Sequence, residues 1–136
     1  MLVLTKKVYN DIVSHSKADF PIEACGYLAG KDNLITYAFK LKNMDNSPEH
    51  FSFNPEEQFA TFKKVRSLGL SILGVYHSHP YTPARMSEED IRLAYDENLY
   101  YAIISLVQQE PDLKIFKVKK GIVEKIEYQI MEYGGK

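Results

Sequence analysis

The sequence has one cysteine, no excess of charge of either sign and no long apolar run. A single cysteine, Cys25, cannot form an internal disulfide or supply a four-thiolate metal site, which excludes disulfide-stapled secreted scaffolds and structural zinc ribbons. Because 17 basic residues are balanced by 18 acidic ones, the net charge of −1 provides no field to attract a nucleic acid or an anionic membrane. We therefore expect a cytoplasmic protein with neither of those partners.

The longest apolar stretches, residues 70–76 and 100–107, are far shorter than the roughly 20 residues of a membrane-spanning helix, and they predict buried strands. The apolar stretch at the amino terminus is also too short for a signal peptide. The chain of 136 residues has no internal repeat and no Gly/Ser-rich linker, so we expect residues 1–136 to form one domain.

Helical and strand patterns alternate along the chain. A helix capped by Thr5 must end before Pro21, and a second helix, capped by Asn54, ends at Gly69. A third helix begins at Ser87. Strands are predicted at residues 2–5, 25–29, 34–41, 71–77, 101–107, 113–118 and 122–130. This alternation predicts an α/β sandwich built on a mixed sheet.

Two histidines lie at the end of the strand predicted over residues 71–77. In the segment His77-Ser78-His79-Pro80 the histidines are two positions apart, so both imidazoles point from one face of the strand, about 7 Å apart along the chain. Ser78 points away, and Pro80 ends the strand and directs the following loop. This spacing lets the two imidazoles share a metal ion.

Asp90 can complete the ligand set, because it falls in the first turn of the helix that Ser87 opens. Two imidazole nitrogens and one carboxylate oxygen leave a fourth tetrahedral position open, as in catalytic zinc sites. An isolated His-x-His pair is more often structural, however, and Ser87-x-x-Asp90 is also a helix-capping pattern. The combination of all four residues, which a shuffled chain of this composition rarely shows, favours the metal site.

The motif formed by the two histidines, Ser87 and Asp90 resembles the JAMM motif. That motif is the metalloprotease signature of the MPN-plus domain family, which contains deubiquitinases and their prokaryotic relatives. Residues 21–30 and 43–55 resemble the small bacterial and archaeal branch of the family. The resemblance covers nearly the whole chain and implies the family's fold, an α/β/α sandwich with a mixed β-sheet that is related to the cytidine deaminases.

The resemblance also implies a role for each site residue. It makes His77, His79 and Asp90 the ligands of one zinc ion per chain. It makes Glu23 the general acid and base, and Ser87 the group that steadies the oxyanion. These roles suit the chemistry, since bound zinc makes hydroxide available at neutral pH and a carboxylate outside the ligand set can transfer the proton.

Other assignments stay open when the residues are considered alone. Glu88 and Glu89 are as well spaced as Glu23 to serve as the base, and Glu23 could be a solvated loop carboxylate. Cys25 fits the apolar core better than a role as a thiol acting on the metal.

Two further histidines and the carboxyl-terminal segment do not indicate a catalytic or metal-binding role. His15 and His50 have no partners at ligand spacing, so we expect surface or hydrogen-bonding roles. The end Gly134-Gly135-Lys136 looks like the tail of a ubiquitin-like protein, but no β-grasp pattern precedes it, and we expect a frayed terminus.

The resemblance implies a zinc-dependent isopeptidase or amidase that acts on a β-grasp protein ending in Gly-Gly. That protein would be a sulfur carrier from which cysteine is released, or a ubiquitin-like modifier removed from a lysine. Eukaryotic relatives that cut ubiquitin chains carry insertions for gripping two ubiquitins, whereas here only seven residues separate His79 from Ser87. We expect the extended tail to pair as an added strand with a sheet edge near residues 43–53.

Two other function classes remain as alternatives. The family also contains non-catalytic MPN scaffolds, but such members have lost metal ligands that this chain retains. A zinc hydrolase acting on a different amide is the other alternative. Base deaminases of a related fold need a Pro-Cys-x-x-Cys segment, which a chain with one cysteine does not have.

Overall fold

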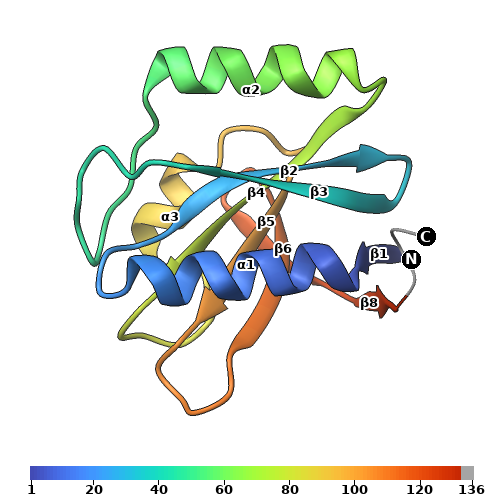
Figure 1. Cartoon of the computed structure of the whole chain (residues 1–136). Helices are drawn as coiled ribbons and strands as arrows, with labels where there is room; N and C mark the ends of the chain where they lie inside the picture. The colour runs from blue at the N-terminus through green and yellow to red at the C-terminus, as the bar shows by residue number, and fades with distance from the viewer. Residues whose placement is uncertain (133–136) are drawn as a thin grey trace.

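A computed structural model describes residues 1–132 of the chain (Figure 1). The Gly134-Gly135-Lys136 end lies outside the described residues. The elements in chain order are β1 (Leu2–Thr5), α1 (Lys6–Asp19), β2 (Cys25–Lys31), β3 (Leu34–Leu41), α2 (Pro55–Ser67), β4 (Ser71–His79), α3 (Glu88–Leu93), β5 (Tyr100–Ser105), β6 (Asp112–Lys119), β7 (Ile122–Ile126) and β8 (Tyr128–Met131). Within residues 1–132, none of the helices is both long and apolar enough to cross a membrane.

All eight strands join one mixed sheet in the order β7-β6-β5-β4-β2-β3-β1-β8. The pairs β4–β5, β1–β3 and β1–β8 are parallel, and the other neighbours are antiparallel. The strands at the two ends of this order, β7 and β8, are separated in the sequence only by Glu127. The sheet must therefore curl until its two edges approach each other, and the Tyr128 hydroxyl donates to the Leu113 carbonyl of β6 across this closure (2.6 Å).

The curl corrects one prediction. The single strand expected over residues 122–130 is two strands, because the chain pairs with β6 as far as Ile126 and then pairs with β1 from Tyr128 onward. A hydrophobic pattern alone does not reveal such a change of partner, since both halves keep an extended backbone.

Helix α1 covers one face of the sheet. It begins where expected, with the Thr5 hydroxyl accepting a hydrogen bond from the Val8 amide (3.1 Å), and it ends before Pro21. Val8 and Ile12 are fully buried against the sheet. The core on this face consists of Leu2, Leu4, Val8, Ile12, Leu28, Ile35, Tyr76, Ala102, Ile104, Leu113 and Ile115.

Helix α2 lies across the sheet from α1, which gives the predicted α/β/α layering (Figure 1). Asn54 caps it as predicted, by accepting from the amides that follow Pro55, and Gly69 ends it with a φ of +70°. On this same face the loop after β4 folds back over the sheet, and Ala84 packs against Ile103 and Phe116. This packing of the loop brings α3 back toward the end of β4.

Candidate metal centre

Strand β4 presents both histidines to one space. His77 and His79 are buried, and because β4 lies between β2 and β5 its backbone is fixed on both sides. The Nε2 atoms of the two rings are 3.2 Å apart. The predicted same-face placement is therefore present, and the strand extends through His79 rather than ending at residue 77.

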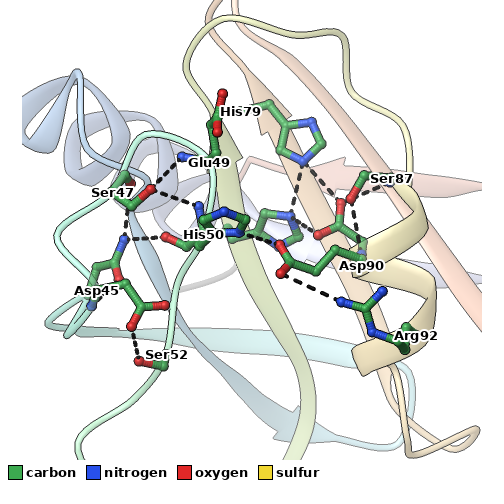
Figure 2. A network of polar contacts seen from close by, with 12 residues as sticks. Asp45, Ser47, Glu49, His50, Ser52, His79, Ser87, Asp90 and Arg92 are labelled. Carbon is green, nitrogen blue, oxygen red and sulfur yellow. Dashed lines mark hydrogen bonds and ion pairs between the residues drawn. The ribbon is translucent and has the colours of Figure 1, made fainter.

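Asp90 reaches the two histidines from α3. Its Oδ1 lies 3.3 Å from His77 Nε2, and its Oδ2 lies 3.1 Å from His79 Nε2. Ser87 caps the helix by accepting from the Asp90 amide (3.0 Å), and Asp90 Oδ2 accepts in return from the Ser87 amide (3.0 Å). Figure 2 shows this reciprocal pair beside the His79 ring. The capping pattern and the metal-ligand pattern are thus compatible, because the cap holds the carboxylate where a ligand is needed.

The three side chains fit a tetrahedral zinc ion. Zinc bonds of about 2.0–2.1 Å place neighbouring ligand atoms roughly 3.3 Å apart. The two Nε2 atoms are 3.2 Å apart, and each oxygen of the Asp90 carboxylate lies at a similar distance from one of them. His79 Nδ1–H donates to the Pro83 carbonyl (2.9 Å), which leaves the lone pair of Nε2 free to bind a metal. The set of two nitrogens and one carboxylate is typical of open zinc sites.

The charge on Asp90 suits the same task. Burial opposes its ionisation, but the neighbouring His77 and His79 and the hydrogen bond from the Ser87 amide outweigh burial and hold the pKa of Asp90 well below its ordinary value. The carboxylate is therefore an anion across the physiological pH range, as a zinc ligand must be.

Glu23 lies just before β2, in a segment that is pinned on three sides. Its amide donates to the Ser47 carbonyl (2.9 Å), and its own carbonyl accepts from the Asn43 side chain (3.1 Å). The next amide, that of Ala24, donates to the Ser78 hydroxyl (2.8 Å), so the serine between the two histidines holds the backbone beside Glu23. The alternative of a solvated loop carboxylate is wrong, because Glu23 is only 4% exposed.

The pKa of Glu23 is raised from 4.5 to about 9. Burial is the main cause, and the negative charges of Asp90, Glu89 and Glu49 add to it. The two carboxyl groups of the site therefore have opposite shifts, which is the pattern expected when one is a ligand and the other a proton carrier.

Residues 43–53 form a loop, so the sheet edge near which the substrate tail was expected to pair does not lie within this segment. The Asn43 side chain, itself buried, donates to the carbonyl of His50 (2.8 Å), and its oxygen accepts from the Asp45 amide (3.0 Å). The backbone groups of the loop are thus partly used within the loop itself (Figure 2). The edge strands of the sheet are β7 and β8.

The same loop contacts α3 and the candidate metal-ligand set, His77, His79 and Asp90. His50 Nδ1 lies 2.6 Å from Glu89 Oε1, and this hydrogen bond raises the pKa of His50 (Figure 2). The Phe51 ring stacks on His77 with their centroids 4.8 Å apart. Glu89 is therefore committed to His50, whereas Glu88 is exposed to solvent.

The remaining predicted residues fall outside this cluster. Cys25 is fully buried, and burial raises the pKa of its thiol to about 12, as expected for a core residue. His15 is a buried hydrogen-bonding residue on α1, with Nδ1 2.7 Å from the Tyr76 hydroxyl and Nε2 3.0 Å from Asp19.

Sequence reasoning did not assign three residues that shape the site. Ser78 and Asn43 position Glu23 through hydrogen bonds, and Phe51 stacks on His77. For Ser78 the sequence did carry a signal, because a polar residue in a strand expected to be buried needs a hydrogen-bond partner. The other two contacts join segments far apart in the sequence, so the sequence carried no local signal for them.

Comparisons with known proteins agree with this geometry. A family model described as prokaryotic homologs of the JAB domain matches residues 5–119. The chain is 26% identical over 137 residues to the CysO-cysteine peptidase of Mycobacterium tuberculosis (strain ATCC 25618 / H37Rv), with 97% of this chain and 92% of that protein covered. It is 31% identical over 111 residues to the desampylase of Haloferax volcanii, with 76% of this chain and 80% of that protein covered.

A solved structure supports the same fold. The solution structure of protein DSY2949 from Desulfitobacterium hafniense superimposes with a TM-score of 0.89 at 44% identity, covering 97% of this chain and 94% of that one.

The shifted pKa of Glu23 predicts a pH-dependent cost of folding. The pKa of Glu23 is about 9 in the folded protein, above the ordinary value of 4.5, so folding favours the protonated form. The resulting contribution to the free energy of unfolding is fully present below pH 4.5 and is lost as pH rises toward 9. Glu23→Gln should remove this loss in the metal-free protein. The difference in free energy of unfolding between variant and parent should grow by up to about 1.4 kcal/mol per pH unit over this interval. Urea denaturation from pH 5 to 9 measures it, and a difference that does not change with pH would contradict the assignment.

Proposed function

Because the chain belongs to the family of prokaryotic JAB domain homologues, a JAMM-type family of hydrolases, we propose that it is a zinc-dependent peptidase that cleaves after the C-terminal Gly-Gly of a ubiquitin-like or sulfur-carrier protein. The observation that carries the proposal is the meeting of His77, His79 and Asp90 beside a buried Glu23. The names of the relatives support the substrate class, since one is a CysO-cysteine peptidase and another a desampylase.

In this proposal His77, His79 and Asp90 hold one zinc ion per chain. When bound, zinc supplies a Lewis acid and a nucleophile at neutral pH. A non-catalytic scaffold needs no such set, and the retention of all three residues in ligand geometry speaks against that alternative.

Glu23 and Ser87 act around this centre. In its ionised form Glu23 can take a proton during attack and return it to the leaving amine, and its raised pKa makes this carboxylate a stronger base than an ordinary glutamate. The Ser87 hydroxyl accepts a hydrogen bond from the Asp90 amide, which leaves its own O–H free to donate to the substrate carbonyl oxygen as that oxygen gains negative charge. One such donor contributes about 2.7–4 kcal/mol in other hydrolases.

The residues around the candidate metal centre favour a substrate with small side chains next to the scissile bond. His50 and Glu89 tie the loop of residues 43–53 to α3, and Phe51 packs against His77. Glycine residues carry no side chain and can approach backbone and ring atoms closely. A Gly-Gly tail therefore suits this approach better than a chain with bulky side chains next to the scissile bond.

Metal binding and turnover should separate by residue. His77→Ala and Asp90→Ala should each lower zinc affinity, and activity should be lost with the metal. The decrease should exceed the roughly 10–100-fold loss that follows mutation of a residue that only hydrogen-bonds to a metal ligand. Glu23→Gln should keep one zinc per chain and lower kcat by about 10²–10⁴-fold. Zinc content by mass spectrometry and turnover measure the two effects.

The matched control for Glu23→Gln is Glu88→Gln, which changes an exposed acid next to the ligand set. It should keep both zinc and turnover. If Glu88→Gln abolished turnover while Glu23→Gln did not, the base would be Glu88 and the proposed role of Glu23 would be wrong.

Two substrates test the bond that is cut. One is a β-grasp carrier ending in Gly-Gly-Cys, and the other carries its Gly-Gly on a lysine side chain. Intact mass spectrometry after incubation with zinc-loaded protein should show cleavage after Gly-Gly in at least one of them, and the faster one distinguishes cysteine release from modifier removal. Absence of cleavage in both, with zinc bound, would contradict the proposed substrate class and direct attention to other amides.

A further inference from the structure

A cavity of about 340 Å³ opens directly beside the metal-ligand set. His77 and Asp90 contribute to its wall. The rest of its lining is mainly apolar and aromatic, and includes Tyr27, Phe53, Val75, Leu93, Leu99 and Tyr101. Cavities of this size and character bind apolar groups, with a few polar atoms that fix their orientation.

The hydroxyl groups of Tyr27 and Tyr101 each have a protein partner. The Tyr27 hydroxyl accepts from the Gln58 side chain (2.8 Å), and the Tyr101 hydroxyl donates to the Asp96 carbonyl and accepts from its amide (both 3.2 Å). The rings of these residues therefore offer carbon surface to a ligand. Asp96 also lines the cavity, so a negatively charged ligand group is disfavoured.

The aromatic wall is built onto the metal-ligand set itself. Ring centroids are 4.8 Å apart for His77 and Phe51, 5.5 Å for Phe51 and Phe53, and 4.9 Å for Phe53 and Tyr27. Contacts at these distances stabilise a fixed arrangement of rings. A side chain seated in the cavity is therefore held at a fixed position relative to the scissile bond.

The location of Glu23 indicates which half of the substrate enters the cavity. The described residues that line it include His77 and Asp90 but neither His79 nor Glu23. Since the leaving amine must receive its proton from Glu23, the leaving group lies on the Glu23 side. The acyl half, which ends in Gly-Gly, then extends toward the cavity.

We propose that this cavity selects a large aliphatic or aromatic side chain at one of the two positions that precede the Gly-Gly of the substrate. The inference rests on the proposed function and adds to it a requirement beyond the Gly-Gly itself. Two glycines place no side chain in the cavity, so the residues before them are the first that can fill it. A serine there leaves the apolar wall unfilled, and an aspartate is repelled by Asp96.

The test compares peptide amides in which each of the two positions before Gly-Gly is Leu, Ser or Asp. At one of these positions kcat/KM should be at least about tenfold higher for Leu than for Ser, the discrimination expected of an apolar pocket, and lowest for Asp. Binding of the corresponding peptides with a free Gly-Gly end to the zinc-loaded Glu23→Gln variant, measured by calorimetry, should follow the same order. This second readout does not depend on turnover.

Filling the cavity should remove the selectivity. Leu93→Trp places an indole in the lining and should lower the Leu-to-Ser ratio of kcat/KM toward one, and Leu99→Phe should lower it from another part of the wall. Leu68→Trp, just after the last residue of α2, is the matched control, because Leu68 is outside the cavity lining and is 37% exposed, close to the 43% of Leu93. The control should keep the parent ratio, and zinc content should be equal in all variants.

The outcomes separate the two proposals. Cleavage after Gly-Gly with equal kcat/KM for Leu, Ser and Asp would overturn the cavity proposal and leave the proposed function standing. An unchanged Leu-to-Ser ratio in both cavity variants would overturn it as well. If no peptide or carrier with a Gly-Gly end were cleaved or bound, the proposed function would fail first.

Discussion

The site depends on one constraint, which is that two imidazole nitrogens from β4 and the Asp90 carboxylate from α3 stay within contact distances of 3.1–3.3 Å. The flanking strands fix the backbone of β4, and the Pro83 carbonyl orients the His79 ring. The reciprocal cap between Ser87 and Asp90 holds the carboxylate. A short helix of six residues with a strong cap is enough, because its task is to present one side chain.

The two carboxyl groups of the site show how environment divides their roles. Asp90 stays ionised because the histidines and the helix cap stabilise its charge, whereas Glu23 holds its proton because it is buried near other carboxylates. The residues that secure Glu23, Ser78 and Asn43, are neither acids nor ligands. The position of Glu23 therefore depends on hydrogen bonds to the backbone beside it and not only on its own side chain.

Much of this could be predicted from the sequence, because local rules govern it. Strand alternation places His77 and His79 on one face, and the capping pattern places Asp90 in the first turn of its helix. The change of partner between β7 and β8 depends on closure of the curled sheet, which no local pattern encodes. The same is true of the contact between His50 and Glu89, and of the hydrogen bonds that Asn43 makes within the loop of residues 43–53.

The most direct test of the central claim is anomalous diffraction at the zinc edge from crystals of zinc-loaded protein. We predict one zinc per chain, bound by one nitrogen each of His77 and His79 and one oxygen of Asp90 at about 2.0–2.2 Å, with a light-atom fourth ligand. A zinc peak away from these three residues, or a sulfur ligand at about 2.3 Å from Cys25, would contradict it.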